Sequence, residues 1–166
     1  MRSSTARRVV AIALAIVTLA SACGESEPEA DAFTPIAVRD FDSQPAELRH
    51  TDGRPLVINF FAESCAPCVA EMPAFDAVHR ALGDTVDFVG LSEDATAAAG
   101  QRIIAATGIS YPTLWDADGS ALSRFQAIGL PTTVFVTATG EVVDVHTGVL
   151  TEETLTAKVD ELVDRG

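Results

Sequence analysis

Hydrophobic residues along the chain follow a strand period in some segments and a helix period in others. Leu56–Phe61 is a nearly continuous apolar run, which predicts a strand buried on both faces of a sheet. The segment after it changes period, and its apolar positions fall on one helical stripe. The members of this stripe are Cys68, Met72, Phe75, His79 and Leu82. The sequence therefore predicts a buried strand that leads directly into a helix.

The rest of the chain continues this alternation. Further strands are expected at Ile36–Val38, as an edge strand, and at Val86–Leu91, Thr113–Trp115, Thr132–Thr137 and Val142–Val145, the last two joined as a hairpin. Further helices are expected at Thr96–Thr107, at Ser120–Ile128, and from Thr151 to Val163. This order predicts an α/β fold, a mixed central β-sheet flanked by helices on both faces, in one domain over residues 33–166.

The first residues of the chain have the pattern of an export signal. Val9–Ala20 is an uncharged stretch of 12 residues, with arginines before it and small residues after it. A bilayer-spanning helix needs about 20 apolar residues, so this stretch is too short to span a membrane. It fits the apolar region of a secretory signal instead, and a signal peptide over residues 1–22 is expected.

Charge excludes two classes of partner. The chain has 166 residues, 11 of them Lys or Arg and 24 Asp or Glu. All acidic residues follow the predicted signal peptide, so the mature part carries 24 acidic side chains against 8 basic ones. Such a surface repels nucleic acid and anionic lipid headgroups, so neither is an expected ligand.

Two cysteines stand where the buried strand passes into the helix. Residues at i and i+3 of a first helical turn can bring their Cα atoms to the roughly 5.5 Å that a disulfide requires. A thiolate at a helix N-terminus is stabilised by free backbone amides, which lowers its pKa below about 8.5. Cys65 and Cys68 are therefore candidate redox thiols. Half of a zinc site is the alternative, but a closed site needs about four ligands and no second pair is apparent.

The segments around these cysteines resemble the thioredoxin superfamily. The resemblance rests on Phe60–Cys68, on Pro73 and on Gly129–Val136. It is nearest to the exported TlpA/ResA/DsbE-type thiol-disulfide oxidoreductases. It implies a thioredoxin-like fold, a redox disulfide between Cys65 and Cys68, no metal and no cofactor.

The resemblance also implies roles for single residues. Cys65 corresponds to the attacking thiol and Cys68 to the resolving thiol. Pro131 corresponds to a cis-proline that faces the pair, and the backbone of Leu130 to a hydrogen-bonding edge for an incoming peptide. Glu71, three residues after the second cysteine, corresponds to a glutamate that modulates the thiols; a solvated position on the helix face is the alternative for it.

Two positions depart from the family pattern. Ser64 replaces the aromatic residue that usually precedes the first cysteine. Asn59 replaces the buried carboxylate of cytosolic thioredoxins, and an amide cannot relay a proton.

The third cysteine has a different expected role. The segment Leu19–Cys23 resembles the lipobox of bacterial lipoproteins, in which the cysteine is lipidated and becomes the first residue after cleavage. Lipidation of Cys23 would also remove an odd free thiol from an oxidising compartment. Gly24–Ala32 is acidic and has little to bury, so it is expected to act as a tether. A secreted protein without a lipid is the alternative.

The resulting hypothesis is a monomeric, membrane-tethered thiol-disulfide oxidoreductase outside the cytoplasm, lipid-anchored at the outer face of the cytoplasmic membrane or periplasmic. Family resemblance favours a reductant of protein disulfides, with a possible role in cytochrome c maturation, recharged by a membrane thiol donor of the CcdA/DsbD kind. A thiol oxidase is one alternative. A peroxiredoxin-like peroxidase is another, although Ala62 stands where that class has Thr or Ser. A copper chaperone is the third, although related Sco-type proteins separate their two cysteines by three residues.

Overall fold

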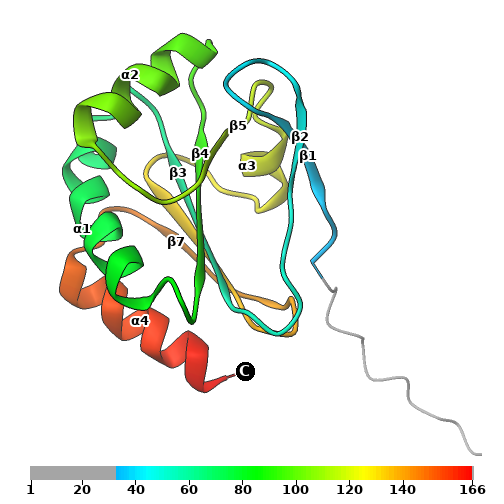
Figure 1. Cartoon of the computed structure of the whole chain (residues 1–166), viewed down its shortest axis with the longest axis vertical. Helices are drawn as coiled ribbons and strands as arrows, with labels where there is room; N and C mark the ends of the chain where they lie inside the picture. Colours follow the sequence, from blue (N-terminus) through cyan, green and yellow to red (C-terminus); the bar gives the residue numbers. More distant parts are fainter. Residues whose placement is uncertain (1–32, 166) are drawn as a thin grey trace, which may run out of the picture.

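The computed structural model describes residues 33–165, which form a seven-stranded sheet in the order β2-β1-β5-β4-β3-β6-β7 (Figure 1). The strands are β1 (Ile36–Arg39), β2 (Pro45–Leu48), β3 (Leu56–Phe61), β4 (Asp87–Ser92), β5 (Thr113–Trp115), β6 (Thr132–Val136) and β7 (Val142–Thr147). Parallel pairs join β3 to β4 and β4 to β5, and antiparallel pairs join the remaining neighbours. The expected mixed sheet is therefore confirmed. The predicted signal peptide, Cys23 and the tether lie outside the described residues.

Helices cover both faces of the sheet. They are α1 (Ala66–Leu82), α2 (Ala97–Thr107), α3 (Ser120–Arg124) and α4 (Glu152–Asp164). One hydrophobic cluster joins α1, α2 and α4 to one face, and a second cluster lies on the α3 side (Figure 1). Alternate residues of β3 enter the two clusters: Val57 and Phe61 face α1, whereas Ile58 and Phe60 face α3. This alternation places every second β3 side chain beneath α1.

Several local signals act as expected. Thr96 caps the N-terminus of α2, and Gly108 ends it in the left-handed region at φ 66°. Thr151 opens α4 with a capping box, in which Thr151 and Thr154 satisfy each other's backbone N–H groups. Gly140 has φ 87° in the turn between β6 and β7, which form the predicted hairpin.

Two expectations about the elements are wrong. The β1 strand is not at the edge, because the unpredicted strand β2 pairs with it on its outer side. The helix expected to run to Ile128 ends at Arg124. Gln126 adopts the left-handed φ of 54°, and Phe125 turns onto Phe60 with ring centroids 5.9 Å apart. Packing of this aromatic ring against the sheet accompanies the early end of the helix.

The stripe predicted on α1 is buried over its first three members. Cys68, Met72 and Phe75 are buried as expected. His79 is only half-buried; its ring meets those of Phe88 and Tyr111, with centroids 5.5 and 6.0 Å away. An acidic residue outside the apolar stripe, Glu71, is also among the buried positions of the helix.

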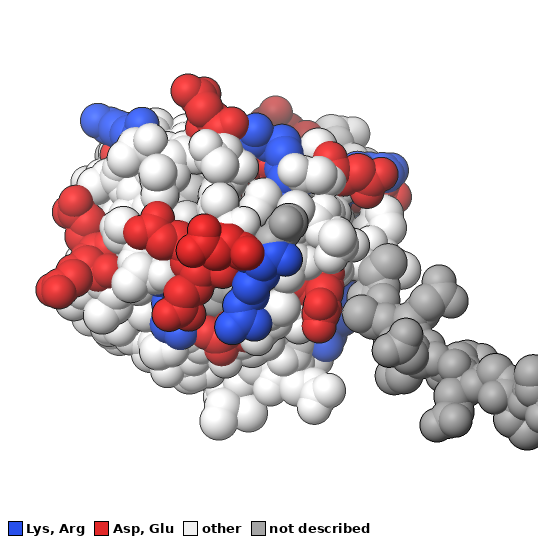
Figure 2. Space-filling view, turned by 90° about the horizontal axis from the view of Figure 1, so that it is seen from below, with Lys and Arg blue, Asp and Glu red and all other residues white. Residues whose placement is uncertain are grey.

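The described surface is acidic. Figure 2 shows one face of the molecule, on which acidic side chains gather around fewer basic ones. Most basic side chains are paired with a carboxylate, as in Arg54 with Asp87 and Lys158 with Asp144. Between residues 33 and 165, no helix combines the length and apolar character that crossing a membrane requires.

Candidate active site

The two cysteines lie at the N-terminus of α1, directly after the central strand β3. Cys65 is the N-cap residue with an extended backbone, and Pro67 occupies the first turn, where its missing N–H costs no helical hydrogen bond. A disulfide joins Cys65 to Cys68, with an S–S distance of 2.09 Å and Cα atoms 5.3 Å apart. The disulfide that the spacing permits and the resemblance implies is thus present in the structure.

The two cysteines differ in their exposure to solvent. Cys68 is 0% exposed and belongs to the core cluster under α1, whereas Cys65 is partly exposed. The backbone N–H of Cys68 donates to Cys65 Sγ at 3.3 Å. The same first-turn amides would stabilise a thiolate on Cys65 after reduction. Cys65 is therefore the more accessible of the two cysteines, and burial closes Cys68 to an incoming disulfide.

The Leu130–Pro131 bond is cis, as the resemblance implies. Pro131 is buried and immediately precedes β6, whose first residue Thr132 pairs with Phe60 of β3. The cis-proline therefore lies beside the strand end from which the chain continues to Cys65. Leu130 is partly buried and packs against the same core cluster as Cys65.

Glu71 lies one turn beyond Cys68 and is only 1% exposed. Its carboxylate accepts a hydrogen bond from Asn59 Nδ2 at 2.9 Å and another from the backbone N–H of Leu150 at 3.1 Å. The hydroxyl of Tyr111 donates to Asn59 Oδ1 at 3.2 Å. These contacts form a buried polar chain under α1. The alternative of a solvated helix position for Glu71 is wrong.

Burial dominates the electrostatics of this buried polar chain of Tyr111, Asn59 and Glu71. Burial raises the pKa of Glu71 to about 7, although its hydrogen bonds from Leu150 and Asn59 oppose the rise. Burial also raises the pKa of the Tyr111 hydroxyl, with a further contribution from the Glu71 charge. Glu71 can therefore hold or release a proton near neutral pH, close in sequence to the two cysteines.

The contribution of Asn59 was not expected from the sequence. The sequence predicts only a lost proton relay at this position, but in the structure the Asn59 amide connects Tyr111 to Glu71. Asn59 of β3 stands where cytosolic thioredoxins have a buried carboxylate, and here the buried carboxylate is that of Glu71 on α1. One signal was available: Asn59 alternates with Val57 and Phe61, so it shares their side of the strand.

Within residues 33–165, no group of three or more His, Cys, Asp or Glu side chains is arranged to hold a metal ion.

Comparison with known proteins gives consistent similarities. The family model described as AhpC/TSA family matches residues 30–145. The thiol-disulfide oxidoreductase ResA of Halalkalibacterium halodurans is 28% identical over 117 residues, which are 70% of this chain and 66% of that protein. The chain thus spans slightly less than two thirds of that relative.

Two solved structures share the fold. MTB DsbF, in its mixed oxidized and reduced forms, has a TM-score of 0.70 at 27% identity and covers 76% of this chain and 94% of its own. A secreted Mycobacterium tuberculosis disulfide oxidoreductase homologous to E. coli DsbE has a TM-score of 0.67 at 27% identity, with coverages of 76% and 96%. The fold is therefore thioredoxin-like.

Proposed function

Since the chain belongs to the AhpC/TSA family and has a thioredoxin-like fold, we propose that it is a thiol-disulfide oxidoreductase that acts on protein substrates. One observation carries the proposal: a disulfide at a helix N-terminus joins a partly exposed cysteine, Cys65, to a buried one, Cys68. A bridge that closes so short a loop stabilises the fold little, which argues against a structural role for it. Thiol exchange is the role that such a pair supports. The similarity to proteins named ResA and DsbF supports the same activity.

The proposed reaction begins with the reduced dithiol. The Cys65 thiolate attacks one sulfur of a substrate disulfide; a new S–S bond forms, and the second substrate sulfur leaves as a thiolate. Cys68, once deprotonated, attacks Cys65 Sγ and releases the first substrate sulfur. The substrate gains two electrons and two protons as its disulfide becomes a dithiol, and the Cys65–Cys68 disulfide is formed again. A reductant then restores the dithiol.

Glu71 is proposed to assist the second step. Its position on α1, one turn from Cys68, and its raised pKa suit a group that accepts the proton of the buried thiol. Asn59 and the Leu150 N–H hold this carboxylate in place. Glu71 would therefore influence the pH at which the dithiol reacts.

The segment before β6 is proposed to bind the substrate chain. The backbone of Leu130 would pair with an extended peptide beside Cys65, and the buried ring of Pro131 would set the edge of that binding surface. Ile128, two residues earlier, is 94% exposed and would add apolar contact with the substrate.

The cellular setting is proposed from the N-terminal sequence. Cleavage after residue 22, lipidation of Cys23 and the acidic segment after it would hold a monomeric domain outside the cytoplasmic membrane. A membrane thiol donor would then recharge the cysteines, and the protein would act as a reductant. The secreted relative from Mycobacterium tuberculosis supports export.

Trapping of substrates tests the activity. In the variant Cys68→Ser, Cys65 can attack a substrate disulfide but the mixed disulfide cannot be resolved, so covalent adducts should accumulate. The matched control Cys65→Ser should trap little, because Cys68 is buried. Mass spectrometry of non-reduced adducts measures both and identifies the substrates. Equal trapping by the two variants, or no trapping by either, would contradict the assigned roles.

The direction of electron flow requires a separate measurement. The reduction potential of the Cys65–Cys68 couple distinguishes a reductant from an oxidant, because potentials that differ by tens of millivolts separate these classes. Peroxide consumption by the reduced protein would favour the peroxidase alternative. Stoichiometric copper binding would favour the chaperone alternative.

A further inference from the structure

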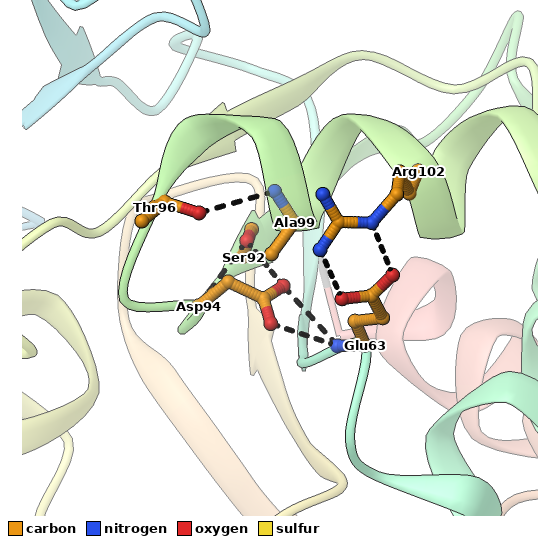
Figure 3. Close-up of polar contacts among 6 residues, drawn as sticks. All are labelled: Glu63, Ser92, Asp94, Thr96, Ala99 and Arg102. Carbon is orange, nitrogen blue, oxygen red and sulfur yellow. Dashed lines mark hydrogen bonds and ion pairs between the residues drawn. The ribbon is translucent and has the colours of Figure 1, made fainter.

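The loop that precedes Cys65 is attached to two neighbouring elements (Figure 3). Within the loop, the N–H of Cys65 donates to the carbonyl of Ala62 at 3.0 Å. The N–H of Glu63 donates to both carboxylate oxygens of Asp94, at 3.0 and 3.2 Å. Asp94 follows β4, the parallel neighbour of β3. The backbone two residues before the attacking sulfur is thus held from the adjacent strand end.

Asp94 is itself fixed in position and is 8% exposed. The hydroxyl of Ser92 donates to Asp94 Oδ2 at 2.9 Å, and Trp115 Nε1 donates to the backbone carbonyl of Asp94 at 2.7 Å. Helix α2 packs so closely against Ser92 that a Cβ on Gly100 would lie 2.5 Å from Ser92 Oγ. A carboxylate held in this way offers a rigid acceptor to the loop.

The side chain of Glu63 provides the second attachment. Arg102 of α2 binds its carboxylate through Nε and Nη2, both at 2.6 Å, a bidentate pair that is shown in Figure 3. This pair lowers the pKa of Glu63, chiefly through the hydrogen bonds from Arg102. It also places a cation beside the only acidic side chain in the loop.

We propose that Asp94 is a positioning residue for thiol exchange, which holds the loop at Glu63 so that Cys65 Sγ remains at the N-terminus of α1. The proposal rests on the proposed function, because it assigns Asp94 a part in the reactivity of Cys65. Asp94 contacts neither sulfur in the structure; it acts through one backbone N–H and the short loop after it. Arg102 assists through the side chain of the same residue.

Two neutral variants of the full chain separate positioning from charge. Asp94→Asn removes the charge but keeps an oxygen that can accept the Glu63 N–H, and its amide can donate to the Ser92 hydroxyl oxygen. Asp94→Ala removes both the charge and the acceptor. After reduction, alkylation of Cys65 is measured against pH, with mass spectrometry to distinguish it from the other cysteines. Asp94→Ala should react about threefold more slowly than Asp94→Asn below the thiol pKa, as expected for partial loss of helix N-terminal stabilisation.

Asp76→Ala is the matched control for lost stability. Asp76 also accepts a backbone N–H and a serine hydroxyl, both from Ser110, at 2.6 and 2.7 Å, but it lies further along α1. This variant should lose stability without a change in the Cys65 profile. Identical profiles for Asp94→Ala and Asp94→Asn would overturn the positioning role, as would an equal slowing in Asp76→Ala. If wild-type Cys65 shows no thiol exchange with oxidised glutathione, the proposed function fails instead.

Discussion

At the scale of single residues, Glu71 differs most between its sequence context and its environment. It occupies an ordinary helical position in the sequence, but in the structure it ends a buried polar chain from Tyr111 through Asn59. Whether a glutamate on an amphipathic helix faces solvent or core depends on the stripe that packs inward. Here the stripe includes it because Asn59 and the Leu150 N–H offer donors on that side.

Glu71→Gln should shift the alkylation profile of reduced Cys65 to lower pH. Above about pH 7 the Glu71 carboxylate is ionised, and a nearby negative charge opposes thiolate formation. Removal of this charge should lower the midpoint by about half to one pH unit. Asp76→Asn, on the same helix but further from the cysteines, is the control. Superimposable profiles for Glu71→Gln and wild type would leave Glu71 a structural residue.

At the scale of elements, the ends of β4 and β5 bring acidic residues together. Glu93 follows β4, and Asp116 follows β5; each has one buried carboxylate oxygen without a hydrogen-bond partner among the described residues. Burial, reinforced by Asp116 and more weakly by Asp118 and Asp94, raises the pKa of Glu93 to about 9. Glu93 is therefore protonated in the folded protein at neutral pH.

This proton makes stability depend on pH. Between the ordinary glutamate pKa of about 4.3 and the folded value of about 9, the folded state binds a proton that the unfolded state has released. Stability should therefore fall as pH rises through this range. Glu93→Gln supplies a neutral donor to Asp116 and should raise stability by about 1 kcal/mol at pH 8, a figure reduced for solvent screening. Near pH 4 it should have little effect. Thermal unfolding at both pH values measures this, and an equal change at both would contradict the assigned proton.

At the scale of the whole molecule, the domain is acidic. The charge that excludes nucleic acid as a ligand also keeps the domain from adhering to anionic lipid, so membrane attachment would depend on Cys23.

Cys23→Ser should therefore move the protein from the membrane fraction to the soluble fraction. Its redox activity should persist, because the Cys65–Cys68 pair lies within the described domain. Fractionation followed by an insulin-reduction assay measures both properties. Retention of the variant in the membrane fraction would contradict lipidation as the anchor.

Most of the architecture was determined by local signals in the sequence. The apolar run of β3, the caps Thr96 and Thr151, and the left-handed Gly108 act within a few residues, so their effects are readable without the fold. The cysteine spacing likewise permitted the bridge, because one helical turn sets the distance between the two residues, and the family resemblance implied it. The short strand β2 was missed because its pairing with β1 depends on main-chain bonds rather than on an apolar pattern.

Only the tertiary structure decided where α3 ends and which residues surround the two cysteines. The early end of α3 accompanies the packing of Phe125 against Phe60, which lies more than sixty residues earlier in the chain. The burial of Glu71 depends on donors from β3 and from the segment before α4. The attachment of the loop to Asp94 depends on the parallel pairing of β3 with β4. Local sequence sets the position of a thiol on its helix, whereas the proton and charge environment of that thiol comes from residues that only folding brings near.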